Sequence, residues 1–378
     1  MGLLLPLSGP AADLGEDMLA AAEMALFDVG DNPLVLLPRD TAGTPQGARQ
    51  AAEQVIADGA EVILGPLFSQ AVGAVSPVAQ AANLRVLAFS NVASATTEGT
   101  YLLGFRPEEQ VSRVVRYALG QGLVRIAGLA PDDAYGNTAM EALRRAVLEN
   151  GGQLAATAFY PAGRADPSGV VRQVAAYDQR HAALETERQR LQQQEDDPQA
   201  KQELEHLKTL DTLGPPPFDA VLLADGGNRL RSVASLLTFF DVDPSNARFL
   251  GTMRWQDDPR VLEEPALQGG WFAAAPPEGM RGFEERFKSA YGRAPQQLAA
   301  LAYDATALAV IAARDLGDRT FAPATLTNGQ GFTGATGLFR LRANGLADHG
   351  LAILEVHGPA TRAIDPAPTA FVEALATR

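Results

Sequence analysis

Short apolar stretches alternate with longer segments of helical periodicity along most of this chain. Residues 62–64 (VIL) and 86–89 (VLAF) are two such stretches, and a small-residue helical segment runs between them from Ser69 to Asn83. Continuous apolar runs of strand length, separated by helical segments, are typical of parallel strands that are covered on both faces. The pattern therefore predicts an α/β protein built on parallel sheets.

The same alternation occurs in two consecutive series. The first begins with the apolar run 3–7 and ends near the short strand expected at 102–106, and the second begins with a helix at 108–120. Two series of this kind predict two lobes of similar plan. Near the end of the chain, 337–341 (GLFRL) and 351–356 (LAILEV) predict a β-hairpin that turns through Asn344-Gly345.

One segment departs from this rhythm. Residues 168–214 are highly charged and helical, and Pro198 divides them into two helices with narrow apolar stripes, which predicts a helical hairpin. A crossover between parallel strands needs only about a dozen residues, so we interpret the segment as an insertion. Two roles stay open for it: a solvated decoration, or a docking arm for another protein.

Composition narrows the possible partners. The chain has 378 residues, of which 46% are hydrophobic, so it is long enough for two domains with real cores. Its net charge of −14 argues against a nucleic-acid partner, because phosphate binding favours a basic surface. No apolar run approaches the roughly 18 residues of a membrane span, and there is no cysteine for disulfides or thiolate chemistry.

The motifs of common catalytic and cofactor sites are missing. The sequence contains no GxSxG elbow, GxxxxGK[ST] loop, GxGxxG fingerprint or HExxH helix. The acidic pairs Asp132-Asp133 and Asp257-Asp258 are more typical of turns and helix caps than of acid–base catalysis. We therefore expect a protein that is not an enzyme, with no catalytic residues, no cofactor and no metal.

Polar side chains follow two successive predicted strands. Ser69 and Gln70 come after the strand at 62–64, and the loop from Ser90 to Ser94 comes after the strand at 86–89. In open α/β sheets the ligand crevice lies outside the carboxyl ends of the strands, so these loops are candidate ligand contacts. Helix capping is the alternative interpretation, and the two roles are compatible.

Several stretches resemble a known family. Residues 4–26 (LLPLSGPAADLGEDMLAAAEMAL), 63–91 (ILGPLFSQAVGAVSPVAQAANLRVLAFSN), the Ala134-Tyr135-Gly136 turn and 218–227 (FDAVLLADGG) resemble type I periplasmic binding proteins of the Leu/Ile/Val-binding, extracellular ligand-binding receptor group. More narrowly, 177–191, 218–231 and 269–276 (YDQRHAALETERQRL, FDAVLLADGGNRLR and GGWFAAAP) resemble the penicillin-binding-protein activator subgroup.

The resemblance implies a Venus-flytrap fold, in which two Rossmann-like lobes are joined by three crossover strands. We expect lobe 1 at 1–106 and 274–342, and lobe 2 at 107–273 and 343–378, with the helical hairpin insertion at 168–214 in lobe 2. The implied function is non-enzymatic closure of the lobes on a small amino-acid-like solute, as in ABC-transporter solute receptors. The alternative is a penicillin-binding-protein activator that regulates peptidoglycan synthesis by protein contact.

The same resemblance implies the location and the partners. We expect a periplasmic protein whose signal peptide or lipid anchor lies outside this sequence. Its partners would be a small-molecule ligand, an amino acid or a related compound, and either an ABC permease or a cell-wall synthase. It would have no direct membrane span and no nucleic-acid partner.

In lobe 1, the resemblance implies that Ser69 and the loop after the next strand bind the carboxylate and ammonium groups of an amino acid. The candidate ligand contacts of this lobe are Ser69, Gln70, Ser90, Asn91, Val92 and Ser94.

In lobe 2, the resemblance implies that the helix-opening Tyr135 contacts the ligand. Where amino-acid binders place an acidic residue, this chain has Met253 and Arg254, and Leu14 replaces an aromatic residue in the first loop. An ammonium anchor is therefore missing from its usual place, although Asp225 could substitute from a neighbouring loop. The candidate contacts of this lobe are Tyr135, Asp225, Gly226, Arg254 and Trp255.

Each of these candidates has a structural alternative. Tyr135 could pack the floor between the lobes. Asp225 could only cap the helix that starts near Asn228. Arg254 and Trp255 could anchor their loop or form a cation and aromatic platform.

Overall fold

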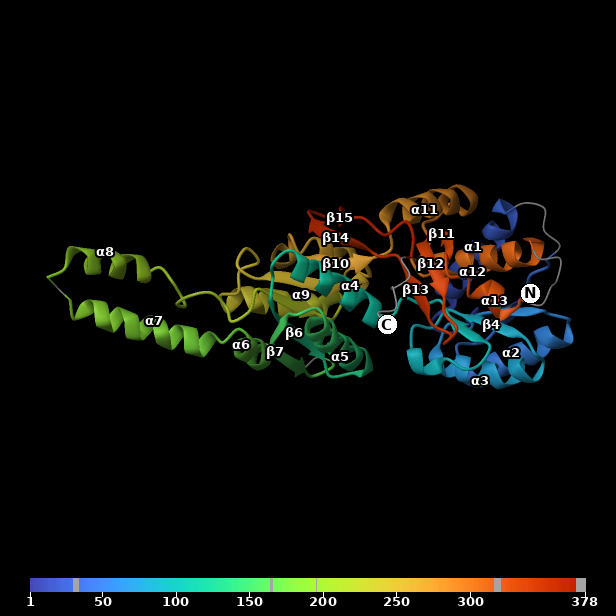
Figure 1. Cartoon of the computed structure of the whole chain (residues 1–378), viewed down its shortest axis with the longest axis horizontal. Coiled ribbons are helices and arrows are strands. Elements are labelled where there is room, and N and C mark those ends of the chain that lie inside the picture. Colours follow the sequence, from blue (N-terminus) through green and yellow to red (C-terminus); the bar gives the residue numbers. More distant parts are fainter. Residues whose placement is uncertain (30–33, 164–165, 195, 316–320, 372–378) are drawn as a thin grey trace, which may run out of the picture. The chain divides into compact units, whose positions relative to one another are not determined.

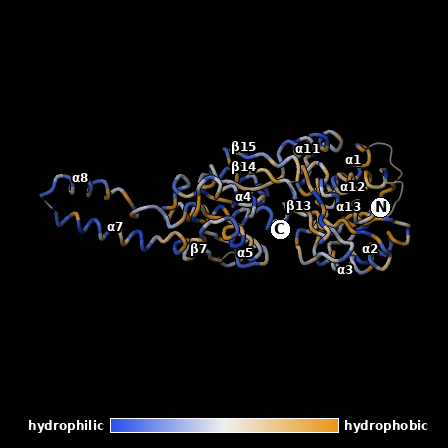
Figure 2. Tube along the Cα trace, viewed as in Figure 1, coloured by the Kyte–Doolittle hydropathy of each residue, from blue (hydrophilic) through white to orange (hydrophobic). Residues whose placement is uncertain are grey.

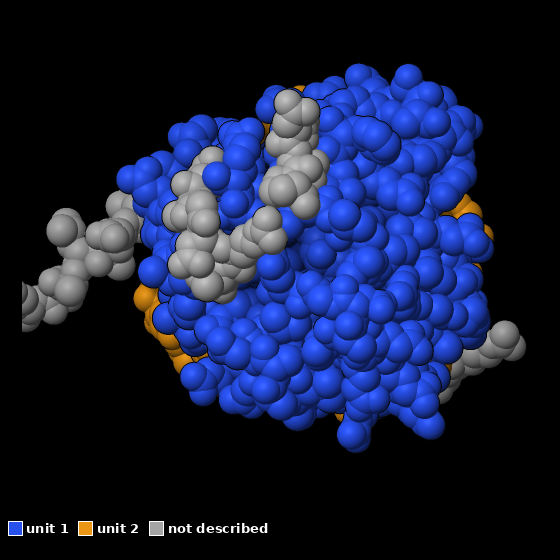
Figure 3. All heavy atoms as spheres, turned by 90° about the vertical axis from the view of Figure 1, so that its right-hand side faces the viewer, with its two compact units in different colours: residues 1–109, 275–352, 366–378 blue, residues 110–274, 353–365 orange. Residues whose placement is uncertain are grey.

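The computed structural model describes residues 1–29, 34–163, 166–194, 196–315 and 321–371 (Figure 1). The chain divides into two compact units, coloured separately in Figure 3. Unit 1 contains Met1–Glu109, Ala275–Ala352 and the chain from Pro366 onward, and unit 2 contains Gln110–Ala274 and Ile353–Asp365. Both units combine helices with a mainly parallel sheet, so the predicted α/β class with two lobes is confirmed.

Unit 1 is built on a five-stranded sheet in the order β2-β1-β3-β4-β5, in which all neighbours are parallel. The strands are β1 (Gly2–Leu5), β2 (Leu37–Asp40), β3 (Val62–Leu64), β4 (Arg85–Ala88) and β5 (Thr100–Leu102). The helices are α1 (Ala12–Asp28), α2 (Pro45–Ala57), α3 (Ser69–Ala81), α11 (Pro277–Tyr291), α12 (Ala299–Asp315) and α13 (Pro323–Leu326), with a 3-10 turn η1 (Ala93–Ala95).

The strands of unit 1 are apolar on both faces because helices cover both. Leu4 and Ile63 are fully buried in the cluster that α2 and α3 form with the sheet. Since side chains alternate along a strand, Leu3 and Leu64 face the opposite layer, where α1 packs against α12 (Figure 1). This two-sided burial explains why the strands read as continuous apolar runs.

A second, antiparallel sheet in unit 1 corrects the predicted terminal hairpin. It contains β11 (Phe332–Gly334), β12 (Gly337–Leu341) and β13 (Ala347–His349). The turn at Asn344-Gly345 is tight, with the Arg342 amide donating to the Leu346 carbonyl at 2.8 Å, so β12 pairs at once with β13. β12 does not pair with the later apolar run, and the predicted 337–341/351–356 hairpin is therefore wrong.

Because of this pairing, the boundaries between the two units differ from the predicted ones. Residues 343–352 belong to unit 1 rather than to lobe 2, because β13 is hydrogen-bonded to β12. The chain returns to unit 1 after Asp365, and the Phe371 ring lies 4.4 Å from the Arg340 guanidinium. At the first crossover the observed boundary follows Glu109, close to the predicted one.

Unit 2 is built on a seven-stranded sheet in the order β15-β14-β10-β9-β8-β6-β7. The strands are β6 (Arg125–Pro131), β7 (Gln153–Tyr160), β8 (Ala220–Leu223), β9 (Arg248–Thr252), β10 (Trp271–Ala274), β14 (Ala352–His357) and β15 (Ala360–Asp365). β6 to β10 pair in parallel, whereas β15 is antiparallel to β14. The helical elements are α4 (Pro107–Gly120), α5 (Ala134–Glu149), α9 (Gly227–Phe239), η2 (Met253–Gln256), α10 (Pro259–Leu262) and η3 (Pro265–Leu267).

The charged segment between β7 and β8 contains α6 (Ser168–Val174), α7 (Tyr177–Gln192) and α8 (Pro198–Leu207). We call residues 177–213 the helical arm. α6 and α7 are separate helices because Ala176 between them has a left-handed backbone, with φ of 50°. Figure 2 shows that α7 is mostly hydrophilic. The small buried cluster between α7 and α8 consists of Leu184, Leu191, Ala200 and Leu207. That this segment is an insertion relative to the family stays a prediction.

Candidate functional site

A hollow of about 430 Å³ lies in unit 1 at the carboxyl ends of β2, β3 and β4. We call it the strand-end pocket. Its lining residues are Gly43, Pro45, Leu67, Phe68, Ser69, Gln70, Ala71, Ser90, Asn91 and Val92. This is the edge of a parallel sheet at which α/β proteins bind ligands, and loops after neighbouring strands meet there.

The first turn of α3 supplies polar backbone groups to this pocket. Ser69 is the first residue of α3, and no side-chain hydrogen bond caps the helix at Phe68. The early amides of a helix have no partner within the helix, and the helix dipole makes this end partly positive. An uncapped helix start beside a hollow is therefore suited to a carboxylate or another anion.

The loop after β4 supplies the other polar wall. The buried Ser90 hydroxyl accepts a hydrogen bond from the Val92 amide at 3.2 Å, and the Asn91 side-chain amide donates to the Phe105 carbonyl at 3.3 Å. The structure thus brings both predicted loops of lobe 1 together. Ser94 is the exception: it lies in η1 and is not among the residues that line the pocket.

Phe68 is a pocket residue that the sequence did not identify. Its side chain is 41% exposed, and it lies against Gly43, where an added Cβ would be 3.4 Å from the ring. Phe68 gives the pocket an apolar wall next to the start of α3. The only signal in the sequence was an aromatic residue directly before Ser69, which a buried core residue would match equally well.

In unit 2, Tyr135 and Arg254 lie together near the carboxyl ends of β6 and β9. The Tyr135 hydroxyl donates to the Thr252 hydroxyl at 2.8 Å, and the Arg254 guanidinium lies 4.6 Å from the Tyr135 ring centroid. Burial raises the pKa of Tyr135 to about 12, so the hydroxyl keeps its proton at neutral pH. The two side chains form a cation–π pair. Arg254 thus carries a positive charge in the loop after β9, where the resemblance to amino-acid binders implied an acidic residue.

One acid of each acidic pair caps a helix. The Asp133 carboxylate accepts the Gly136 amide at 2.8 Å at the start of α5, and the Asp258 carboxylate accepts the Arg260 amide at 3.0 Å at the start of α10. For Asp133 and Asp258, the expectation that these acids form turns and caps is therefore confirmed.

Asp225 is already fully engaged within unit 2. Its side chain is 1% exposed and accepts hydrogen bonds from the Tyr160 hydroxyl at 2.7 Å and from the Gly226 amide at 2.8 Å. Arg229 forms a bidentate ion pair with the same carboxylate. Burial raises the pKa of Tyr160, which keeps its hydroxyl a donor to Asp225. Asp225 is thus a structural ion rather than an acid held ready for a ligand's ammonium.

Trp255 anchors its loop in the core. Its side chain is fully buried, and its indole nitrogen donates to the Leu223 carbonyl at 3.2 Å. Gly251 and Gly270 leave room for the ring, since a Cβ at either position would lie within 2.8 Å of it. Trp255 therefore belongs to the core of unit 2 and is not a ligand contact, contrary to the prediction. Gly226 packs against the backbone of Arg254, where an added Cβ would be 2.9 Å from the carbonyl oxygen.

The groups that line the strand-end pocket can contact a ligand through hydrogen bonds and apolar surface. Within the described residues, no group of three His, Cys, Asp or Glu side chains is placed to hold a metal ion. The strand-end pocket combines backbone amides, hydroxyl and amide side chains, and an apolar wall. In the described part of the chain, no helix is long and apolar enough to cross a membrane.

Comparison with known proteins assigns the chain to a family. The family model described as "Periplasmic binding protein" matches residues 1–361. "Leu/Ile/Val-binding protein homolog 6" of Brucella abortus is 24% identical over 183 residues, which cover 46% of this chain and 47% of that protein. The match thus spans less than half the length of this curated relative.

Solved structures share the fold over nearly the whole chain. A branched-chain amino acid ABC transporter periplasmic ligand-binding protein from Burkholderia xenovorans has a TM-score of 0.72 at 18% identity, covering 98% of this chain and 94% of its own. A solute-binding protein of an ABC transporter from R. palustris, solved with benzoate, has a TM-score of 0.64 at 16% identity, covering 98% and 97%. This chain belongs to the periplasmic binding protein family and has the type I fold of its Leu/Ile/Val-binding group.

Proposed function

We propose that this protein is a solute receptor that binds a small organic acid in the strand-end pocket. The carboxylate lies at the first turn of α3 beside Ser69, and the apolar body lies against Phe68. The observation that carries the proposal is the uncapped start of α3 at a hollow with an apolar wall. Free helix-start amides bind carboxylates through both hydrogen bonds and the helix dipole.

The resemblance implies an amino-acid-like solute, whose ammonium group would need an acceptor in the binding site. An ammonium ion taken out of water needs an acidic or several polar acceptors. The residues that line the strand-end pocket include no acid. In unit 2, Asp225 is engaged by Arg229. Asp257 in the loop after β9 lies 4.0 Å from the Arg254 guanidinium, so these two charges offset each other. These features favour an acid without an ammonium group, such as the benzoate bound by the relative from R. palustris.

The wider role follows from the family. We propose a non-enzymatic, exported protein that delivers its solute to an ABC permease. Closure of two lobes on the solute, expected from the resemblance, stays a prediction, as does the periplasmic location of this chain.

Isothermal titration calorimetry tests the ligand class. The ligands are benzoate, L-leucine and benzyl alcohol, which share an apolar body but differ in their charged groups. The proteins are the wild type, Ser69→Ala, and the control Ser289→Ala, which removes an exposed hydroxyl from α11 of the same unit. We expect benzoate to bind, benzyl alcohol to bind weakly or not at all, and Ser69→Ala to weaken benzoate by about 3- to 10-fold.

Two outcomes would count against the proposal. Tighter binding of leucine than of benzoate, with Ser69→Ala weakening the leucine affinity, would restore the predicted amino-acid ligand in the strand-end pocket and refute the acid class. Equal benzoate affinity for the wild type and Ser69→Ala, with Ser289→Ala also unchanged, would remove the start of α3 from the binding site.

The helical arm favours a second candidate function, that of a penicillin-binding-protein activator. Arg180 at the base of the arm donates to the Gly214 and Asp241 carbonyls at 3.0 Å, and Arg188 donates to the Leu207 carbonyl at 2.7 Å. These buried or half-buried contacts hold the arm in one shape, as a protein-contact element requires. Under this proposal, deleting residues 177–213 abolishes binding to a cell-wall synthase and spares solute binding. Unchanged stimulation of the synthase would refute it.

A further inference from the structure

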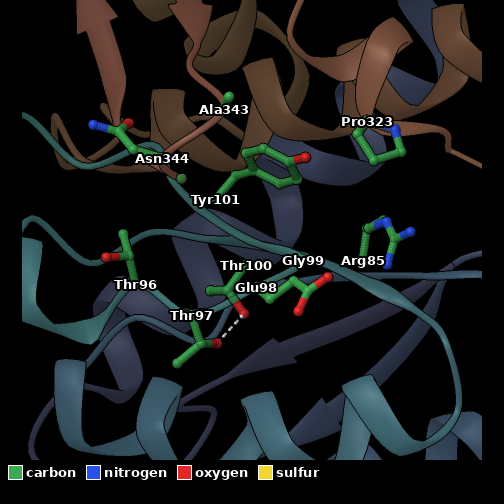
Figure 4. Close-up of a pocket in the computed structure, with 11 residues that line it drawn as sticks. Arg85, Thr96, Thr97, Glu98, Gly99, Thr100, Tyr101, Pro323, Ala343 and Asn344 are labelled. Atoms are coloured by element: carbon green, nitrogen blue, oxygen red, sulfur yellow. Dashed lines mark hydrogen bonds between the residues drawn. The ribbon is translucent and has the colours of Figure 1, made fainter.

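A second hollow in unit 1, of about 440 Å³, lies at the opposite edge of the five-stranded sheet (Figure 4). We call it the Arg85 pocket. Arg85 is the first residue of β4 and Thr100 the first residue of β5, so this hollow meets the amino ends of these strands, whereas the strand-end pocket lies at the carboxyl end of β4. The two hollows share no lining residue.

The Arg85 pocket contains two opposite charges that are not paired with each other. Arg85 and Glu98 both line it, and within the described residues neither makes an ion pair. The Nε atom of Arg85 is buried without a hydrogen-bond partner in the described part of the chain.

Local backbone geometry holds the guanidinium in place. Gly99 has a φ of +78°, and an added Cβ there would lie 3.2 Å from Nη1 of Arg85, so the guanidinium lies directly against this glycine. The Thr97 hydroxyl donates to the Thr100 hydroxyl at 3.1 Å, which fixes the turn between Glu98 and β5 (Figure 4). The two charges are therefore presented from two adjacent places, the start of β4 and the turn that leads into β5.

Tyr101 adds a hydrogen-bond donor beside the positive charge. Its side chain is buried in the wall of the pocket. Burial raises the pKa of Tyr101, although the nearby positive charge of Arg85 opposes that shift. The hydroxyl is thus protonated at neutral pH, and it shares the pocket with a guanidinium, a group that can hold a carboxylate in bidentate fashion.

We propose that the Arg85 pocket binds a free α-amino acid, with its carboxylate on Arg85 and the Tyr101 hydroxyl and its ammonium facing Glu98. The volume lies in the range of small-molecule sites. A zwitterion pairs with Arg85 and Glu98 at once. A simple anion pairs with Arg85 alone and is repelled by the Glu98 carboxylate. This site is separate from the strand-end pocket and does not depend on the function proposed for it.

Amide chemical shifts in ¹⁵N-labelled full-length protein test the proposal. The probes are L-alanine, L-serine and L-leucine, with acetate and methylammonium as ligands that carry one charge each. The variants are Arg85→Gln and Glu98→Gln. Arg49→Gln and Glu53→Gln are matched controls, because they remove the same charges from an exposed pair on α2 of the same unit.

We expect at least one of the amino acids to give saturable shifts at Gly99 and Gly345, which line the pocket. Acetate and methylammonium should not saturate these shifts over the same concentration range. Arg85→Gln and Glu98→Gln should each weaken binding about tenfold or more, and the controls should leave it unchanged. Ser69→Ala should also leave it unchanged, which separates this site from the strand-end pocket.

The proposal is overturned if none of the three amino acids shifts Gly99 and Gly345. It is equally overturned if Glu98→Gln binds as the wild type does, because Glu98 is exposed and its loss should not disturb the fold. Saturation by acetate as tight as by alanine would show an anion site and refute the zwitterion class.

Discussion

Replacing Asp225 with alanine separates a structural ion from a ligand anchor. The carboxylate is 1% exposed and holds both the Tyr160 hydroxyl and the Arg229 guanidinium. In the variant, the Tyr160 hydroxyl stays buried and loses its partner. A hydroxyl in this state costs about 1–3 kcal/mol.

The contribution of Arg229 is smaller. Its side chain is 27% exposed, so water can hydrate part of the guanidinium once Asp225 is gone. We therefore add about 1 kcal/mol for this ion, below the 3–5 kcal/mol typical of breaking a fully buried pair. The expected loss is about 3 kcal/mol in the free energy of unfolding of unit 2, or roughly 6–12 °C in its melting temperature.

Thermal unfolding followed by circular dichroism measures this loss, and hydrogen exchange of β8 amides localises it to unit 2. Tyr160→Phe is the matched control, which removes the hydroxyl and leaves the ion pair, and it should cost only about 1 kcal/mol. The double variant should cost less than the sum of the two single variants, since both act on one hydrogen bond. An Asp225→Ala variant that melts like the wild type but loses an amino-acid ligand would refute the structural role and identify Asp225 as the ammonium anchor.

Three further predictions concern the arm, pH and the β9 loop. Arg180→Gln should loosen the base of the helical arm by removing donors to Gly214 and Asp241, seen as faster proteolysis between residues 177 and 213. Burial raises the pKa of Asp304 to about 6, above its value in an unfolded chain, so the folded state binds this proton more tightly. The protonated Asp304 thus contributes to the free energy of unfolding below about pH 4, and this contribution is lost as the pH rises through 6. In denaturant titrations between these pH values, the wild type should lose roughly 3 kcal/mol of unfolding free energy relative to Asp304→Asn. Trp255→Ala should cost about 3–5 kcal/mol in the same titrations, because it empties a fully buried site, while benzoate affinity of the strand-end pocket stays unchanged.

The parts of the fold that follow from local patterns were predictable. Residues 62–64 and 86–88 are strands with α3 between them, because burial on both faces leaves a continuous apolar run in the sequence. Ser69 was identified for the same reason: it opens the helix that follows a buried strand, at the edge where such sheets bind ligands.

Pairing between distant segments was not predictable from one sequence. The run 352–356 has the pattern of a hairpin partner for 337–341, and only the tight turn at 344–345 diverts that pairing to β13. The role of Asp225 likewise depends on Tyr160, which lies 65 residues away in the chain. Spacing in the sequence gives no sign of such distant contacts. An N-cap, by contrast, can be predicted from neighbouring residues alone.

The Arg85 pocket shows the same limit. Arg85, Glu98 and Tyr101 lie near one another in the sequence, but the hollow exists only because residues 343–345 close it from the second sheet of unit 1. No motif marks these residues as a set. That Arg85 and Glu98 form no ion pair within the described residues can be recognised only from the folded structure, in which their neighbours are known.

The most direct test of the central claim is the ¹⁵N–¹H spectrum of the full-length protein titrated with benzoate. The account predicts saturable shifts of the Gln70 and Ala71 amides in the first turn of α3, together with Asn91 and Val92 in the opposite wall. Shifts confined to other residues, or saturation of these same amides by leucine at lower concentration than by benzoate, would contradict it.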